Sequence, residues 1–346
     1  MTTFAIDENT TIMQHYGIHP VRGFLPAEDP LLRLPAEYAA WEDLGQALPA
    51  LLAAGRAREA VAALPLLDPR SLATEAQWER AMMLLSYFGH AHIFAAPPVS
   101  RHIPAPVAVP WHSVAERVQR PPVLTYASYI LHNWRRLDPA GPIALENLAR
   151  PQHFLGGMDE DWFGMIHIAI EAQAGPGLYA LVVAQDGVAA GDVALVTAQL
   201  GILAQSIVAM LAVLNRTPEK CDPYIYYNRV RPYLSGWLDN PALPDGMIYD
   251  GVAAYDGQPQ FFRGGSGAQS AIIPAIDDAL GLLFDDNPFG RYMRSLRDYM
   301  PPPHRAFIEL MRQRPAIRAF VKRRAHAEPA LVAAYNHCLD VSVAFR

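Results

Sequence analysis

The segment that most restricts the fold is a long apolar run, Val193–Leu214, which contains no charged side chain. Its length is close to the roughly 20 residues that a helix needs to cross a bilayer. A helix that is apolar on all sides is also what the centre of a large helical bundle requires. Polar residues interrupt the run or bound it, namely Thr197, Gln199, Gln205, Ser206, Asp192 and Arg216. We therefore predict a buried core helix in a large helical protein, with no membrane as a partner.

Apolar residues recur at helical spacing along most of the chain, without the alternation of β-strands or a βα rhythm. Ser71 is the expected N-cap of a helix over 71–89. Five prolines between residues 94 and 110 predict an extended connector. Further helices are predicted over residues 112–118, 123–136, 161–173, 193–216, 223–233, 270–284, 288–299, 303–313, 316–326 and 329–346.

The predicted fold class is all-α. Gly175 and Gly177 indicate a connection after the helix over 161–173, and the run 178–186 is compatible with a helix or a short strand. We predict a smaller, mainly helical N-terminal domain over residues 1–157 and a large all-helical domain over residues 158–346.

Charge and cysteine content exclude several classes of protein. The net charge of −6 and the lack of a basic run argue against nucleic acid as a partner. The two cysteines, Cys221 and Cys338, form neither a disulfide framework nor a zinc motif, which fits a reducing compartment. The N-terminus has acids where a secretory signal has basic residues. These features predict a cytoplasmic protein.

Two short runs contain most of the functional information. Residues 222–237 read DPYIYYNRVRPYLSGW, and residues 261–277 read FFRGGSGAQSAIIPAID. Glycine lacks a Cβ, so the Gly-rich loop lets backbone approach a ligand, and its N–H groups suit an anion. Taken alone, such a loop is more often a flexible turn.

Together with other segments in the same order, these runs resemble the indoleamine 2,3-dioxygenase family of haem proteins. The shared segments include YGIHPVRGFLP near the N-terminus, PPVLTYASYILHNW, NPALPDGMIYDGV, YMPPPHRAFIELM and AYNHCLDVSVAFR at the C-terminus. The resemblance covers nearly the whole chain, and the Ala-, Pro- and Arg-rich composition indicates a bacterial-type member.

The resemblance implies a haem b cofactor (iron protoporphyrin IX) and a dioxygenase reaction of tryptophan catabolism. Such an enzyme opens the indole C2–C3 bond of L-tryptophan or a related indoleamine with O2, giving N-formylkynurenine in the kynurenine pathway. The N-terminal domain would cover the distal pocket. We expect a monomer or a weak homo-oligomer.

The resemblance assigns the substrate pocket residue by residue. Arg231 stands where the family has its carboxylate-binding arginine, whose guanidinium can hold a carboxylate through two parallel bonds. Arg229 fits a surface arginine better. Tyr226 and Tyr227 stand where the family usually has two phenylalanines that wall the indole side, and their hydroxyls leave the exact substrate open.

His167 is the candidate catalytic residue. A single histidine in an apolar helix is often a core residue, and the animal enzymes typically have serine at this position. Related tryptophan dioxygenases use a distal histidine to hold the indole N–H, and His167 is similar to that variant. Phe163, one helical turn earlier, would line the same pocket.

Four further residues complete the predicted pocket. Tyr126 and Tyr129 are three residues apart and are expected to close its inner end. Tyr129 replaces a smaller residue usual in the animal enzymes, which predicts a shallower pocket. Leu234 and Gly265 come from the two motif runs.

The resemblance also assigns the cofactor contacts. Gly264, Ser266 and Gly267 are similar to the family loop beside the haem, where Ser266 would bond a propionate. Asp277 and Arg346 resemble the pair that organises the other propionate. A buried Arg–Asp pair is also plausible as core architecture alone.

No residue of the sequence matches the axial iron ligand. In the family the proximal histidine follows the counterpart of Arg346 by three residues, so we expect the ligand beyond Arg346, in a continuation of the chain. His337 and Cys338 lie more than two turns too early. His304 matches a family motif that does not bind the iron.

Three other interpretations remain. Tyr129, Tyr226 and His167 are compatible with a relative that acts on a modified tryptophan in secondary metabolism. A non-catalytic haem- or indole-binding protein is expected if the chain truly ends at Arg346. The third is a helical protein with an empty apolar cavity.

Overall fold

The computed structural model describes residues 8–282 and 287–346. Within them the fold is all-α, as the sequence predicts. The α-helices are α1 (Glu8–His15), α2 (Ala39–Ala53), α3 (Ala57–Ala62), α4 (Glu75–Phe94), α5 (Ala105–Val118), α6 (Met158–Ala190), α7 (Val193–Leu214), α8 (Pro223–Ile225), α9 (Ile272–Leu280), α10 (Pro288–Ser295), α11 (Pro302–Gln313), α12 (Ile317–Arg324) and α13 (Pro329–Phe345). The strands are β1 (His102–Ile103), β2 (Arg135–Arg136), β3 (Leu148–Ala149) and β4 (Ile248–Tyr249), paired β1–β4 in parallel and β2–β3 antiparallel.

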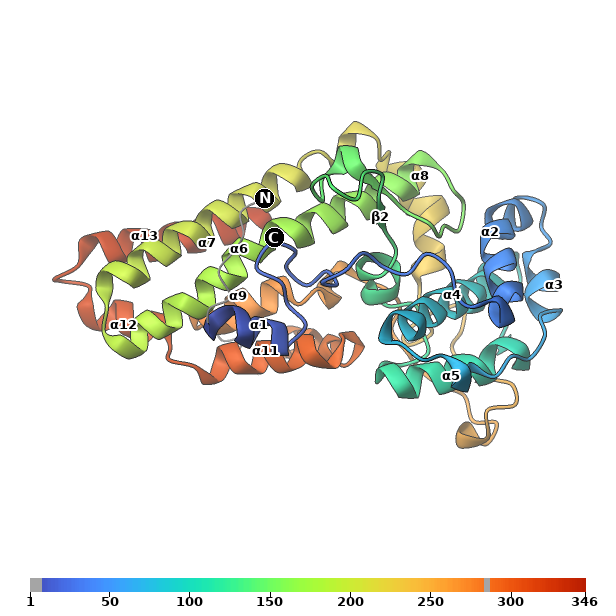
Figure 1. Ribbon diagram of the computed structural model, residues 1–346. Helices are drawn as coiled ribbons and strands as arrows, with labels where there is room; N and C mark the ends of the chain where they lie inside the picture. The colour runs from blue at the N-terminus through green and yellow to red at the C-terminus, as the bar shows by residue number, and fades with distance from the viewer. Residues whose placement is uncertain (1–7, 283–286) are drawn as a thin grey trace.

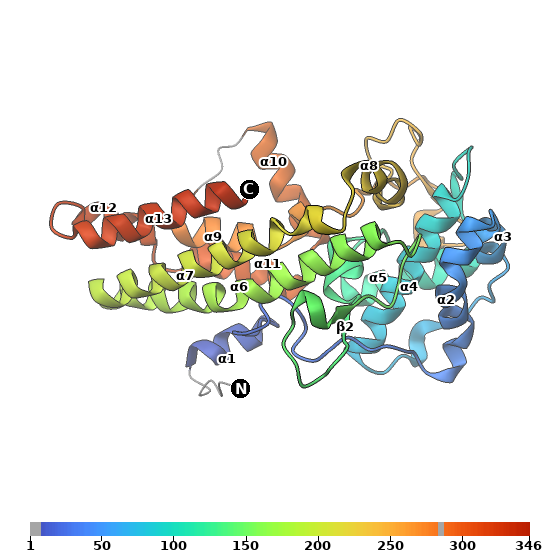
Figure 2. The ribbon, with the colours of Figure 1, turned by 90° about the horizontal axis from the view of Figure 1, so that it is seen from above.

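The helices form two groups at opposite ends of an elongated molecule (Figures 1 and 2). The long helices α6 and α7 run side by side with α13, and α9, α11 and α12 lie against them. Helices α2 to α5 gather at the other end. A continuous core of buried apolar side chains connects the two groups.

The turn between α6 and α7 follows from its sequence. Gly191 ends α6 with a positive φ of 73°, which glycine adopts without steric cost. The Asp192 carboxylate then caps α7 by accepting a hydrogen bond of 2.9 Å from the Leu195 N–H. The chain therefore reverses within two residues, and α7 packs back along α6.

The predicted connection at Gly175 and Gly177 is wrong, because α6 continues through both and the run 178–186 is helical. A Cβ at Gly175 would lie 2.7 Å from the Pro20 carbonyl oxygen, and one at Gly177 would lie 2.7 Å from Ser206 Oγ. These glycines mark close contacts of a buried helix with its neighbours, and such packing overrides the low helix propensity of glycine.

Some helix ends also differ from the prediction. The cap of α4 is Thr74, which forms a capping box with Gln77, whereas Ser71 bonds Tyr38 and Glu37. Helix α5 begins at Ala105, within the predicted connector, because prolines are tolerated in a first helical turn. The helix predicted over 123–136 is reduced to a π-helical turn, Ala127–Leu131. The helix predicted over 270–284 is α9, which ends at Leu280 because Gly281 adopts a positive φ, and residues 283–284 lie outside the described residues.

Two described helices, α6 and α7, are long and apolar enough to cross a membrane by length and composition alone. Most of α6 is buried inside the protein. Helix α7 is less buried than predicted, because it packs on α6 and α13 with one face and exposes Ile202 and Val208 on another.

Segments from both sides of residue 157 meet in each helical group. Tyr16, which follows α1, contacts Phe307 of α11, so the N-terminal segment packs with the long helices. The β1–β4 pair joins residues 102–103 to 248–249, and the buried Trp237 packs on His90 of α4. The chain thus passes between the two groups more than once.

Candidate active site

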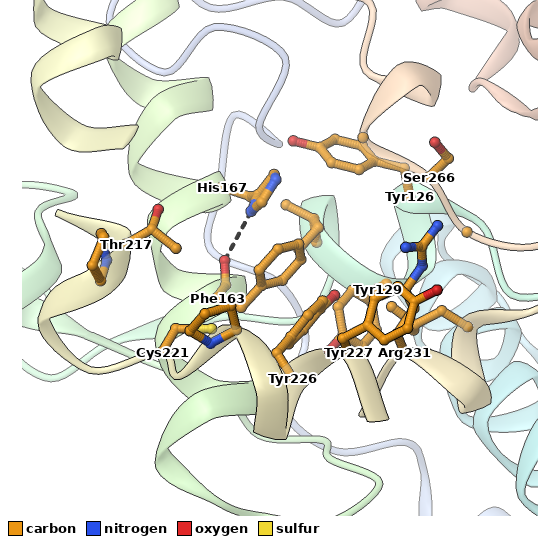
Figure 3. Close-up of a pocket in the computed structure, with 16 residues that line it drawn as sticks. Tyr126, Tyr129, Phe163, His167, Thr217, Cys221, Tyr226, Tyr227, Arg231 and Ser266 are labelled. Carbon is orange, nitrogen blue, oxygen red and sulfur yellow. Dashed lines mark hydrogen bonds between the residues drawn. The ribbon is translucent and has the colours of Figure 1, made fainter. Parts of the chain in front are cut away.

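A cavity of about 530 Å³ lies at this junction and contains the predicted substrate site (Figure 3). That volume is typical of small-molecule sites. Every residue predicted to bind substrate lines it, as does His167. The lining residues are Tyr126, Tyr129, Ile130, Phe163, His167, Thr217, Pro218, Cys221, Pro223, Tyr226, Tyr227, Arg231, Leu234, Gly265, Ser266 and Gly267.

Two π-helical turns supply much of the wall. One is Ala127–Leu131, which includes Tyr129, and the other is Tyr226–Val230, which follows α8 directly. Asp222 starts this second segment by accepting hydrogen bonds from two backbone N–H groups. π-Helical turns are rare and frequently occur at functional sites, because the wider turn shifts the side-chain register.

The two tyrosines of the predicted ring pair have different positions. The Tyr226 ring stacks on Phe163, with centroids 4.0 Å apart and an angle of 24° between the planes (Figure 3). Tyr227 is 60% exposed, and the Arg231 guanidinium lies 5.1 Å from its ring centroid. Tyr226 and Phe163 therefore form the flat inner wall, while Tyr227 supports the arginine at the mouth.

His167 is held in one orientation with one nitrogen free for a ligand. Its Nδ1 lies 2.8 Å from the Phe163 carbonyl oxygen, one turn earlier on α6, and must donate to it because a carbonyl only accepts. Burial lowers the pKa of His167 and keeps the ring neutral. In a neutral imidazole whose Nδ1 carries the proton, Nε2 is an acceptor. A Cβ on Gly267 would lie 3.8 Å from Nε2, so this acceptor faces the Gly-rich loop.

Arg231 combines an exposed position with a place in the cavity wall. It lines the first cavity and a neighbouring polar cavity of about 510 Å³. Within the described residues it has no carboxylate partner, so its charge is available to an anion. Arg229, two residues earlier, is exposed and lines neither cavity.

Behind the inner end lies a buried cation that the sequence analysis missed. The Arg150 guanidinium lies 4.4 Å from the Tyr129 ring centroid. It donates hydrogen bonds to the Tyr87 hydroxyl at 3.0 Å, the Glu160 carbonyl oxygen at 3.0 Å and the Tyr129 carbonyl oxygen at 3.2 Å. The aromatic floor of the cavity is thus fixed by a cation and three hydrogen bonds.

A buried carboxyl group on α6, that of Glu171, forms hydrogen bonds that fix residues on another side of the cavity. Glu171 Oε1 accepts hydrogen bonds from the Tyr126 hydroxyl at 2.9 Å and from Ser270 Oγ at 2.7 Å. Burial raises the pKa of Glu171 to about 7. Glu171 lies one turn after His167, and an acid at that spacing in an apolar helix was the sequence signal that could have identified it.

We expect Glu171→Gln to remove a pH-dependent loss of stability. Because the pKa of Glu171 rises from 4.5 unfolded to about 7 folded, the folded protein binds the extra proton, and stability falls as the pH rises through this interval. The shift corresponds to about 3 kcal/mol at 1.36 kcal/mol per pH unit. We expect the free energy of unfolding of the variant, relative to that of wild type, to be higher at pH 8 than at pH 5 by up to this amount. Urea unfolding at the two pH values provides the measurement.

Glu28→Gln, which changes an exposed carboxylate, is the control and should show no such gain. An equal difference between wild type and the Glu171 variant at both pH values would contradict the prediction.

The Gly-rich loop lies directly against the 234–238 segment. A Cβ on Gly264 would overlap the Leu234 carbonyl oxygen, and one on Gly236 would overlap the Phe262 carbonyl oxygen. The buried Gln269 joins the loop to the cavity wall by donating to the Gly264 carbonyl oxygen and accepting from the Tyr126 N–H, both at 2.9 Å. Gly264 thus has a packing role in addition to its predicted place beside the cofactor.

A second apolar cavity of about 510 Å³ shares Tyr126, His167 and Gly267 with the first. Its remaining lining residues are Ile170, Leu214, Ala268, Ser270, Ile272, Ile273, Pro274, Phe289, Met293, Phe345 and Arg346. Arg346 forms an ion pair with the buried Asp277, whose Oδ2 has no partner among the described residues. Burial raises the pKa of Asp277 to about 6, with Arg346 opposing the shift.

This second cavity fits a haem in two respects. Its walls are apolar, and Arg346 supplies a cation at its edge for an anionic side group. In the described part of the chain no three His, Cys, Asp or Glu side chains form a metal cluster, and His167 is the one imidazole lining this cavity. The axial histidine expected beyond Arg346 stays a prediction.

Comparison with known proteins gives matches along almost the whole chain. A sequence model described as "Indoleamine 2,3-dioxygenase" matches residues 12–346. Indoleamine 2,3-dioxygenase 1 of Rattus norvegicus is 32% identical over 340 residues, covering 97% of this chain and 82% of the relative. A 6-hydroxytryptophan 2,3-dioxygenase of Fusarium equiseti is 32% identical over 344 residues (99% and 84%), and the indoleamine 2,3-dioxygenase of Saccharomyces cerevisiae is 31% identical over 358 residues (97% and 78%).

Proposed function

The chain belongs to the indoleamine 2,3-dioxygenase family and is a haem-dependent dioxygenase, and we propose that it converts L-tryptophan and O2 into N-formylkynurenine. Both atoms of O2 enter the product as the C2–C3 bond of the indole breaks. The strongest support is that a single aromatic cavity is lined by Arg231, which has no carboxylate partner among the described residues, and by His167, whose neutral imidazole can accept a hydrogen bond.

Each part of tryptophan has a partner in this cavity. Arg231 at the mouth binds the carboxylate through two parallel N–H···O bonds. The stacked rings of Phe163 and Tyr226 hold the flat indole. His167 Nε2 accepts the indole N–H and fixes the rotation of the ring. Such positioning converts a bimolecular encounter into an oriented reaction and excludes water from it.

The haem occupies the second cavity in this proposal. Ile272 and Ile273 of α9 and Phe345 at the end of α13 would supply apolar contacts to it, and Arg346, held by Asp277, would bind a propionate. Bound there, the haem iron supplies the activation of O2. Because both cavities share His167 and Gly267, the substrate would lie directly beside the cofactor.

The proposal is tested by supplying the purified protein with haem, a reductant, O2 and L-tryptophan. We expect a product heavier than tryptophan by two oxygen atoms, both labelled when the reaction uses isotopically labelled O2. Absence of this product from every indole amino acid, in a sample that binds haem, would refute the proposal.

The pH dependence of kcat/KM tests the role of His167. Burial lowers the pKa of this histidine, so Nε2 stays an acceptor as the pH falls from 8 through the ordinary histidine value of 6.5. We expect kcat/KM to stay level over that range and to fall below it, where protonation removes the acceptor. His167→Ala should lower kcat/KM by about 10-fold or more and lack this acidic decline. An identical acidic decline in both proteins would exclude His167 as its source.

A modified tryptophan is the second candidate substrate. The Fusarium equiseti relative is named for 6-hydroxytryptophan. In this chain Tyr129 and Tyr226 both line the cavity, and the Tyr226 hydroxyl can bond a polar group on the substrate.

A further inference from the structure

Positive charge is concentrated on α12 and the segment before it, at the end of the molecule opposite α2 to α5 (Figures 1 and 2). Residues 312–326 contain six of the 28 lysines and arginines of the chain and none of its 34 acidic residues. The net charge of the whole chain is −6, so this local excess is not evident from the total. A basic end on an acidic protein is a feature that needs an explanation.

Two of these six cations already have partners. Arg312 forms an ion pair with Glu309, and Arg314 forms one with Asp186. The other four lie on α12 itself, and no ion pair joins them to a carboxylate within residues 8–282 and 287–346. These four are Arg318, Lys322, Arg323 and Arg324. Helix α12 therefore has a positive charge that the described protein does not neutralise.

Helix α12 presents its cations on one side because its other side is buried. The buried side chains pack against α6, α9 and α13, and they are Ile317, Phe320 and Val321. Arg318, Lys322 and Arg323 are exposed. The Arg324 guanidinium lies 3.8 Å from the Phe320 ring centroid, which fixes it at the edge of the same side. The four charges thus form one surface, the α12 basic surface.

The positions of these charges are unfavourable in the free protein. Arg318 and Lys322 are four residues apart, so they are neighbours on the helix surface, where like charges repel. Arg318 is also in the first turn of α12, at the positive end of the helix dipole, which disfavours a cation. Its one hydrogen bond, to the Gly281 carbonyl oxygen, is long at 3.4 Å. An anion outside the protein would relieve the repulsion.

A flat layer of phosphate groups is the partner that fits the α12 basic surface best. Guanidinium groups bind phosphates through paired N–H···O bonds, and about four to eight basic residues on a helix are typical of binding to anionic lipids. The exposed side of α12 offers no aromatic ring to stack on nucleic-acid bases, because Phe320 is buried. Outside residues 312–326 acids outnumber bases, and contact through one end keeps this acidic part away from a flat anionic layer (Figure 2).

We propose that α12 attaches this protein to the surface of membranes that contain anionic phospholipids. The contact is peripheral and electrostatic, because the apolar side chains of α12 are buried inside the protein. The sequence-based expectation of no membrane partner concerned a helix that crosses the bilayer, which this contact does not require. Residues 317–324 line neither the substrate cavity nor the cofactor cavity, so the proposal is independent of the proposed function.

The test measures sedimentation of the whole purified protein with lipid vesicles. Vesicles of phosphatidylcholine alone are compared with vesicles that contain about one-third phosphatidylglycerol, which is anionic. At a salt concentration of about 0.05 M we expect binding to the anionic vesicles only, and we expect its loss at about 0.5 M, because salt screens exposed charges.

The triple variant Arg318→Gln/Lys322→Gln/Arg323→Gln removes three of the four cations and should weaken this binding by about 100-fold, since each cation near an anionic surface strengthens binding about fivefold. The double variant Arg318→Lys/Arg323→Lys keeps every charge and should bind within about fivefold of wild type. Thermal unfolding of each variant shows that it is folded.

The matched control removes three exposed arginines beside α2 and α3, at the opposite end of the molecule, in the variant Arg33→Gln/Arg56→Gln/Arg70→Gln. It has the same net charge as the α12 triple variant and should bind like wild type. An equal loss of binding in both would overturn the proposal, because net charge and not α12 would be responsible. So would equal binding of wild type to both kinds of vesicle, or binding to neither. Binding of wild type to a DNA duplex and not to the vesicles would also overturn it and would assign the surface to nucleic acid.

Discussion

Replacing Arg231 with glutamine should reduce kcat/KM for L-tryptophan by about 100-fold or more. Hydrogen bonds to charged groups contribute about 1.5–3 kcal/mol each, and a bidentate guanidinium–carboxylate pair contains two of them. A loss of about 3 kcal/mol corresponds to roughly 100-fold. Arg231→Lys keeps the charge but not the planar pair of donors, so it should restore only part of the loss. Steady-state kinetics with the haem-loaded protein provide the measurement.

Two comparisons make this result specific to the carboxylate. Arg229→Gln removes a positive charge two residues away, outside both cavities, and should leave kcat/KM within about twofold of wild type. Tryptamine lacks the carboxylate, so wild type and Arg231→Gln should differ little with it. If the Arg231 variant loses the same factor with tryptamine as with tryptophan, Arg231 does not act on the carboxylate, and its packing on Tyr227 would account for the loss.

Local sequence signals were sufficient for much of the helical fold. The uncharged run bounded by Asp192 predicts α7 without reference to the rest of the molecule, although one face of that helix is exposed. These local signals gave wrong helix ends where tertiary contacts determine the structure. Gly175 and Gly177 look like a helix end in sequence, yet they are contact points of α6, and only the position of Pro20 and Ser206 reveals this.

Some residues of the candidate site could likewise be predicted from the sequence, and others could not. The substrate-binding residues predicted in the two motif runs could be placed in one pocket by resemblance to the family, and they line one cavity, whereas Gly264 and Asp277 of the same runs do not line it.

Arg150 could not be placed in this way, because it acts through Tyr87, which is distant in sequence. Glu171 could be placed near His167 by its spacing on the same helix, but its bond with the distant Ser270 could not be predicted. A single sequence gives no information on such pairings.

The loop that joins the two cavities should be sensitive to a single methyl group. Gly264→Ala places a Cβ on the Leu234 carbonyl oxygen and beside the Gly236 amide, both backbone atoms that cannot move alone. The loop must separate from the 234–238 segment, which breaks the Gln269 hydrogen bond to Gly264 and moves Ser266 and Gly267 away from the cavity wall. We expect a loss of about 3 kcal/mol in unfolding free energy, measured by urea denaturation.

Gly265→Ala is the matched comparison, since it makes the same chemical change one residue later. Its Cβ would lie 3.5 Å from the Leu124 carbonyl oxygen and 3.9 Å from the Thr125 carbonyl carbon, both ordinary contact distances, and neither glycine has a positive φ. The unfolding free energy of this variant should therefore stay within about 0.5 kcal/mol of wild type. Equal losses in the two variants would mean that glycine is needed here for backbone freedom. A loss of stability confined to Gly264→Ala would show that the loop needs a close approach of its backbone to residues 234–236. This packing would then position Gly267 opposite His167.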